Sequence, residues 1–376
     1  MAEIEDKPFD DSTKLKLEIF GDCFEEWLPV FIHNHLIQEI YVYDFFSGKG
    51  KDCDGYHGSP LLLIEKSKGK DRKYCSVADK KIVFTFNDVQ KKKADQLKNN
   101  IDNYIKGCCR ANNCSKCSYQ YEVENNDFKK MFYDDKIQAV LANNRFGKFI
   151  LMDQYGFSDV DKDVFQKLIN YPKLDFIFFI STSFISRFRE HPNTKKYIET
   201  EKINFDDAKP KDCHRIIADY FRSMIPESKE YYIHHFTIQK ENKANFYGLI
   251  FGTGHTLGME KFLKICWQKD VMSGEANFNI SNDFEKQSLF YDESVSNRKI
   301  ELKELLKKEI YSFKIKDNIS GIKYVMKNGG QPSIFVEVID SLIEEGKIEV
   351  VNSIKNSQKT NVHKMTKYEF KLLKND

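Results

Sequence analysis

The sequence has no long apolar run and no apolar segment at its start. No stretch approaches the roughly 20 apolar residues that a membrane-spanning helix needs, so we expect no membrane segment. The first residues, MAEIEDKPFDDSTK, are acidic and polar, unlike a secretory signal. These absences predict a protein of the cytoplasm.

Cysteine and net charge are also scarce. Nine cysteines are an odd number, and five of them are scattered singly, so we expect reduced thiols rather than a disulfide framework. The 59 basic and 57 acidic residues leave a net charge of only +2, which points to no nucleic-acid or membrane partner for the chain as a whole. In contrast, hydrophobic residues make up 41% and aromatic residues 14%, which excludes disorder along the whole chain.

Segments typical of strands and of helices alternate after a first helix predicted over residues 14–32. Such alternation predicts a parallel sheet with helices on both faces. Two later strands, 231–239 and 244–251, lie close enough in sequence to form a hairpin. Five parallel strands and a terminal antiparallel hairpin are the plan of a class I methyltransferase sheet, which is a Rossmann-like α/β fold. The five predicted parallel strands are 40–46, 81–86, 118–123, 148–152 and 174–181.

Two domains are predicted. The first, 1–293, contains the methyltransferase-like sheet, the N-terminal helix and an insertion near 184–226. The second, 297–376, has the pattern of a winged-helix domain, with three short helices followed by two strands. From Arg298 onward there are 16 basic and 11 acidic residues, a net charge of +5, which favours a nucleic-acid surface. Protein docking or dimerisation is the alternative use of this domain.

The first strand ends in the motif Asp44-Phe-Phe-Ser-Gly-Lys-Gly50. A tight glycine turn at this point lets a cofactor approach the backbone at the switch point of the sheet. The carboxylate of Asp44 suits the cationic amino-acid end of S-adenosylmethionine (SAM), and the motif lacks the Gly-Lys-Ser/Thr of a phosphate loop. We therefore assign Asp44, Phe46, Gly48 and Gly50 to cofactor binding. The alternative is an ordinary turn.

Polar residues also follow the second and third strands. Asn87 and Asp88 end the second strand, where a carboxylate can accept both hydroxyls of a ribose. Asp127 follows the third strand and could meet the amino group of adenine. Asp88 and Asp127 could each instead cap the helix that follows. Suitable residues at three consecutive strand ends favour a cofactor site.

The fourth strand ends in Asp153-Gln-Tyr155-Gly. Enzymes that methylate amino groups carry Asp/Asn-Pro-Pro-Tyr/Phe here, whose polar residue binds the target amino group and whose aromatic ring stacks on a flipped base. Asp153 and Tyr155 match in type and are our candidate catalytic residues. Because Gln154 replaces proline, an ordinary strand-exit turn is the alternative.

Four cysteines cluster between the second and third strands, namely Cys108, Cys109, Cys114 and Cys117. The last two form a C-x-x-C pair, which could close a tetrahedral zinc site with further thiolates. Adjacent cysteines would be strained as two ligands of one ion. A local redox pair or inert thiols are the alternatives.

The sequence resembles the three-Cys-motif partner proteins, a family called TcmP. The similarity covers about the first 290 residues and rests on five segments, namely Ser12–Trp27, Tyr43–Gly50, Gly58–Leu61, Asp153–Gly156 and Gly254–Trp267. The resemblance implies a methyltransferase-like sheet and a partner protein with a radical-SAM-like three-cysteine motif. The association of this family with phage-related gene sets implies a role with nucleic acid or in phage defence.

Two hypotheses follow for the function. The first is a SAM-dependent methyltransferase that acts on nucleic acid, on DNA rather than RNA, and uses the winged helix as its reader. The second is a non-catalytic adaptor or DNA-binding partner subunit that keeps a relic methyltransferase fold. The acids at the strand ends favour the enzyme, whereas Gln154 favours the adaptor.

Overall fold

The computed structural model describes most of the chain, but Cys114, Cys117 and Tyr155 lie outside the described residues. The chain divides into two compact units. Unit 1 is Met1–Tyr231 with Ile238–Gly254, and unit 2 is Tyr232–Thr237 with His255–Asp376. The domain boundary near residue 295 stays a prediction. The described residues are 7–70, 73–74, 80–112, 120–154, 156–203, 205, 210–240, 245–278, 280, 296–351, 363 and 367–373.

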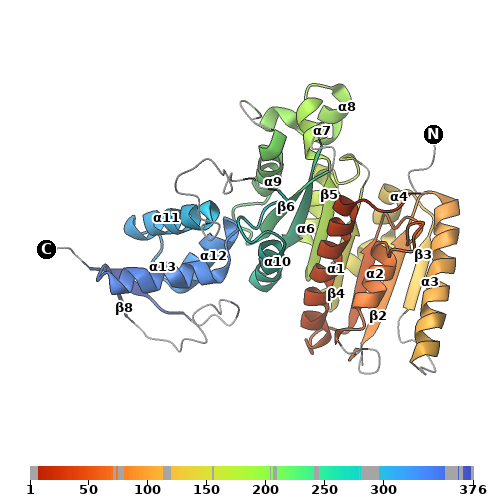
Figure 1. The fold of residues 1–376 in the computed structure, drawn as a ribbon, viewed down its shortest axis with the longest axis horizontal. Coiled ribbons are helices and arrows are strands. Elements are labelled where there is room, and N and C mark those ends of the chain that lie inside the picture. The colour runs from red at the N-terminus through yellow and green to blue at the C-terminus, as the bar shows by residue number, and fades with distance from the viewer. Residues whose placement is uncertain are drawn as a thin grey trace. The chain divides into compact units, whose positions relative to one another are not determined.

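A seven-stranded sheet is the main feature of the fold (Figure 1). Its strand order is β3-β2-β1-β4-β5-β7-β6. Strands β1 to β5 pair in parallel, and β7 runs antiparallel to β5. This order, with a reversed strand beside β5, confirms the predicted class I methyltransferase sheet. The strands are β1 Glu39–Asp44, β2 Lys81–Asn87, β3 Gln120–Glu124, β4 Phe146–Met152, β5 Leu174–Ile180, β6 Tyr232–Gln239 and β7 Phe246–Thr253.

Helices connect the parallel strands, as the alternating pattern predicts. Local chemistry sets where they begin. Asp10 caps α1 by accepting from the Thr13 amide at 2.7 Å, and Pro60 lies in the first turn of α2. The helices of unit 1 are α1 Asp11–Ile32, α2 Ser59–Lys66, α3 Lys91–Ala111, α4 Phe128–Phe132, α5 Asp135–Ala142, α6 Lys162–Asn170, α7 Thr182–Arg187, α8 Pro192–Tyr197 and α9 Cys213–Ser223, with 3₁₀ turns η3 Thr200–Lys202 and η4 Pro210–Asp212.

Helix α1 packs along β4, and this contact positions part of the site. A Cβ added at Gly147 would lie 2.3 Å from the Phe31 ring, so only glycine lets the helix approach the start of β4 this closely. Further along, Trp27 lies 5.2 Å from Phe149, measured between ring centroids. Helix α1 therefore runs against the direction of β4. Its N-terminal residues lie at the carboxyl end of that strand.

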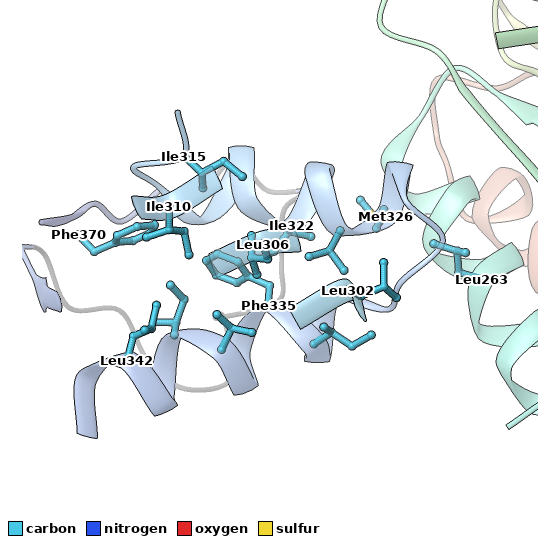
Figure 2. Packing of buried hydrophobic residues seen from close by; sticks show 14 of the residues in the cluster. Leu263, Leu302, Leu306, Ile310, Ile315, Ile322, Met326, Phe335, Leu342 and Phe370 are labelled. Carbon is cyan, nitrogen blue, oxygen red and sulfur yellow. The ribbon is translucent and has the colours of Figure 1, made fainter. Parts of the chain in front are cut away.

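Unit 2 has its own hydrophobic core, part of which Figure 2 shows. The core joins α10 Thr256–Lys269, α11 Asn297–Tyr311, α12 Asn318–Lys327 and α13 Pro332–Glu344 with the antiparallel strands β8 Ile348–Val350 and β9 Phe370–Leu372. Helices α12 and α13 approach closely, because a Cβ at Gly321 would lie 2.2 Å from the Phe335 ring. From α11 onward the elements follow the predicted order, and their identity as a winged helix stays a prediction. No described helix is long and apolar enough to cross a membrane.

Candidate active site at the carboxyl edge of the sheet

Asp44 ends β1 and is completely buried. Burial, with smaller contributions from the nearby charges of Asp153 and Asp88, raises the pKa of this carboxyl to about 7. The Ser59 hydroxyl and the Phe46 amide oppose this effect. Oδ1 accepts a hydrogen bond from the Phe46 amide at 3.2 Å, whereas Oδ2 has no partner at bonding geometry among the described residues. An oxygen that is buried without a donor is costly, so this atom is a strong candidate for a ligand contact.

The glycine turn that follows β1 is held against β2. The Ser47 amide donates to the Asn87 carbonyl at 2.8 Å, and the Asn87 amide donates to the Ser47 hydroxyl at 3.1 Å. Gly48 has a φ of +59°, and a Cβ added there would have no atom within 4 Å. Gly50 has a φ of +85°, and a Cβ there would lie 2.6 Å from Leu97. The turn thus needs both glycines for its backbone, but only Gly48 borders open space.

Asn87 and Asp88 have structural partners at the end of β2. The Asn87 side chain donates to the carbonyls of Phe45 and Asn126 and accepts from the Asn126 amide at 2.9 Å. Asp88 accepts from the Gly48 amide at 3.1 Å and from the Gln90 amide at 2.8 Å. Helix α3 begins at Lys91 with Gln90 at its N-cap, so Asp88 forms this turn rather than the helix cap that was the alternative. Each carboxylate oxygen of Asp88 keeps one lone pair for a further donor.

Asp127 and Phe46 complete the residues assigned to the cofactor. Asp127 caps the short helix α4 by accepting from the Lys130 amide at 3.0 Å, so the alternative of a helix cap is confirmed for this residue. Phe46 is half-buried, and its ring centroid lies 5.1 Å from that of Phe128. The two rings form an apolar surface next to the cap. That surface suits the face of a planar ring.

At the end of β4, Asp153 has a partner that the sequence does not reveal. Lys16, from α1, donates to Oδ2 of Asp153 at 2.5 Å, and both side chains are largely buried. The side chain of Gln154 accepts from the amides of Asp159 and Val160 and so holds the following loop. The strand exit is therefore built without the prolines of an amino-methylating loop.

A cavity of about 760 Å³ opens beside Asp153, within unit 1. Two lysines and two aromatic rings that line it are stacked on one another. Lys16 lies over the ring of Phe179, Phe179 stacks on Tyr247 at 4.8 Å, and Lys240 lies over Tyr247. The lining also includes Phe157, Phe184, Lys196 and Tyr197. Aromatic faces bind planar rings and ammonium groups bind anions, so the cavity suits a planar, anionic ligand.

The sequence alone does not reveal the lysines and aromatic residues of this cavity. They come from α1, the loop after β4, β5, α7, α8, the residue after β6 and the start of β7, which are distant in sequence. The one signal in the sequence is the polar start of α1, where Ser12, Thr13 and Lys16 fall on one helical face. A polar face at the start of an otherwise buried helix can indicate a site.

The two described cysteines of the predicted zinc site do not line this cavity. Cys108 and Cys109 belong to the last turn of α3, and Cys114 and Cys117 lie outside the described residues. Consecutive residues on an α-helix point about 100° apart, so one of the adjacent pair at most fits a single ion. The zinc site therefore stays a prediction, and the positions of Cys108 and Cys109 on the helix do not favour it.

Comparison with solved structures gives likenesses to methyltransferases. The METTL16 methyltransferase domain has 9% identity and a TM-score of 0.28; the alignment covers 61% of this chain and spans 65% of that domain. The O-methyltransferase TomG from Streptomyces achromogenes, in complex with SAM, has 9% identity, coverage of 65% and 89%, and a TM-score of 0.31. A dimethyladenosine transferase from Plasmodium falciparum has 8% identity, coverage of 85% and 96%, and a TM-score of 0.26.

Neither the family models nor the curated proteins gave a match to the sequence. The TM-scores of the structural likenesses are low. The strand order of the sheet and the geometry of the site therefore carry the argument about function.

Proposed function

We propose that this protein is a methyltransferase that binds SAM at the ends of β1 and β2 and modifies a nucleic-acid base held beside Asp153. The cavity carries the proposal, because its stacked rings and lysines lie at the carboxyl edge of a methyltransferase sheet. Ligands of such sheets bind at this edge. DNA is the proposed substrate.

The residues at the end of β1 fit SAM. The unpartnered oxygen of Asp44 would accept from its ammonium group, and the open space at Gly48 would admit its amino-acid end. Asp88 would use its remaining lone pairs for the ribose hydroxyls. When bound, SAM supplies an electrophilic methyl group.

The residues beside the cavity would hold the acceptor. Asp153 would accept a hydrogen bond from an exocyclic amino group of the target base, with Lys16 orienting its carboxylate. The stack of Phe179 and Tyr247 would contact the base face, and Lys196 and Lys240 would contact phosphates.

Calorimetry with SAM tests the first half of the proposal. We expect saturable binding near one SAM per chain. Because the pKa of Asp44 is about 7, ionisation of this carboxyl should improve binding as pH rises from 6 to 8. Asp44→Asn should weaken binding at least tenfold and remove the pH dependence.

Asp175→Asn is the matched control for this experiment. Asp175 is also buried, with a pKa that burial raises to about 6, but it is the second residue of β5 and lies away from the carboxyl edge. It should leave SAM affinity unchanged. Undiminished binding in Asp44→Asn would overturn the assignment of Asp44.

Binding of single-stranded DNA that contains 2-aminopurine tests the second half. A base that leaves its stack for the cavity should change the fluorescence of the probe. Tyr247→Ala should lose binding by about 1–3 kcal/mol, the usual contribution of one stacked base. Lys196→Gln and Lys240→Gln should each reduce the slope of log affinity against log salt concentration by about one, the loss expected for one phosphate contact. An unchanged salt slope in both lysine variants would exclude the cavity as the nucleic-acid site.

A second candidate function is the non-catalytic adaptor, in which the protein works beside a radical-SAM-like partner as the TcmP resemblance implies. The ion pair of Lys16 and Asp153 favours it, because the carboxylate expected to bind a target already has a cation. Methyl transfer from labelled SAM to DNA decides between the two. Transfer that Asp153→Ala abolishes supports the enzyme, whereas SAM binding without transfer supports the adaptor.

A further inference from the structure

The exposed face of α13 is acidic, although the sequence from Arg298 onward is basic overall. The helix contains no lysine or arginine, and its buried face packs into the core of unit 2. The residues that remain at the surface include Glu337, Asp340 and Glu344, followed by Glu345. The described basic residues lie on α11, α12, β9 and the segments between these elements instead. Lys303 of α11 pairs with Glu337 at 2.7 Å, so Glu344 and Glu345 are the acidic residues that carry the proposal below. An acidic face is repelled by phosphates and lacks the side chains that read guanine.

Exposed apolar side chains gather at the end of unit 2 next to this face. Tyr311 and Phe313 lie at the end of α11, Ile343 in the last turn of α13, and Leu373 just after β9; Phe313 is 61% exposed and the others more than 40%. We call these four residues the distal patch. Large apolar surfaces that remain exposed next to charged residues are typical of protein interfaces.

Backbone hydrogen bonds bring the segments of the distal patch together. Leu373 donates to the Lys347 carbonyl at 2.8 Å, and Lys347 donates to the Leu342 carbonyl at 2.9 Å. On its other side, β9 donates from Phe370 to the Lys316 carbonyl at 3.1 Å. In Figure 2, the buried residues Ile310, Leu342 and Phe370 accordingly lie at one end of the cluster.

Phe313 has an unusual backbone conformation. Its φ of +59° lies in the left-handed region, where a helix normally ends with glycine or asparagine. A bulky side chain makes this conformation unfavourable, and the exposed ring gains little from burial. Strain without a packing benefit is typical of residues that serve binding.

We propose that the distal patch and the acidic face of α13 dock a partner protein through a basic, amphipathic helix of that partner. The apolar stripe of such a helix would cover Phe313, Ile343 and Leu373, and its lysines or arginines would meet Glu344 and Glu345. A second copy of this chain fits less well, because a symmetric contact uses the same surface of both copies and that surface includes no basic helix to meet Glu344 and Glu345. The proposal does not depend on SAM or on the acceptor cavity.

Fluorescence anisotropy of the full chain with two labelled 18-residue peptides tests this surface. One peptide is an amphipathic helix of leucine and lysine, and the other has the same pattern with glutamate in place of lysine. We expect saturable, one-to-one binding of the basic peptide only. Phe313→Gly should weaken it at least tenfold while the melting temperature stays equal or rises, because glycine relieves the left-handed backbone.

Charge variants distinguish binding by the acidic face of α13 from nonspecific attraction of the basic peptide to the net charge of the chain. Glu344→Lys combined with Glu345→Lys should weaken binding about tenfold, whereas Glu190→Lys combined with Glu227→Lys, an equal change of net charge in unit 1, should not. Equal effects of both pairs, or unchanged binding in Phe313→Gly, would overturn the proposal. So would a DNA duplex that displaces the peptide, or a dimer in sedimentation that Phe313→Gly dissociates.

Discussion

The two halves of the sheet edge in unit 1 differ in how their polar groups are used. At the ends of β1 and β2, side chains form hydrogen bonds mainly with nearby backbone groups. The side chain of Asn87, for example, connects Phe45 with Asn126. At the ends of β4 and β5, rings and lysines instead line an open cavity. The first half is held rigid, with one buried oxygen of Asp44 left without a partner, whereas the second half is shaped to receive a large ligand.

This difference teaches that an acidic residue at a strand end does not by itself indicate whether it binds a ligand or stabilises the fold. Asp127 caps a helix, Asp88 holds a turn, and Asp44 keeps an unsatisfied oxygen, although all three have the same place in the sequence pattern. The hydrogen-bond partners of each side chain decide whether that side chain stabilises the fold or remains available to a ligand.

Among the substitutions, the largest loss of stability should come from Asn87→Ala, which tests the rigidity of the first half. The substitution leaves two carbonyls and one amide without their partner, at about 1 kcal/mol or more each, so we expect a loss of about 3 kcal/mol. Urea unfolding measures it. Tyr247→Ala, from the open half, is the comparison and should cost less in stability. A smaller loss of stability for Asn87→Ala than for Tyr247→Ala would show that the first half is not the more rigid of the two.

Much of this edge could be predicted from the sequence, because the carboxyl ends of parallel strands always meet. That rule brought Asp44, Asp88 and Asp153 to one edge. Lys16 could not be assigned in this way, since its approach to Asp153 depends on how α1 packs against Gly147. The cavity has the same origin, because helices and strands distant in sequence form its walls.

The second effect concerns pH, through Asp44. Burial raises its pKa to about 7 in the folded state, so between about pH 4 and 7 the folded chain holds a proton that the unfolded chain has released. Stability should therefore fall with rising pH by up to about 1.4 kcal/mol per unit and level off above pH 7. Asp44→Asn should remove this contribution.

Unfolding of the parent chain, Asp44→Asn and Asp175→Asn at pH 5, 6, 7 and 8 measures that contribution. Burial raises the pKa of Asp175 only to about 6, so its contribution should level off about one unit lower. Parallel pH profiles for the parent and Asp44→Asn would show that this carboxyl is not the group that titrates.

A third effect tests the ion pair between Asp153, in the second half of the edge, and Lys16 at the start of α1. Lys16→Met keeps the length of the side chain but leaves the partly buried Asp153 without its cation, for which we expect a loss of about 2 kcal/mol. The double variant Lys16→Met/Asp153→Asn should recover most of that loss. A double-mutant cycle with no coupling would show that the pair contributes nothing to the fold.

The smallest effect should come from Gly48→Ala, which separates backbone cost from ligand space. An alanine at φ +59° costs about 1 kcal/mol and meets no neighbour, whereas Gly50→Ala should cost more, because its Cβ would lie 2.6 Å from Leu97. If the space at Gly48 admits SAM, Gly48→Ala should weaken SAM binding beyond its small effect on stability. Full SAM affinity in this variant, measured by calorimetry, would mean that the open space at the first half of the edge is not used by the cofactor.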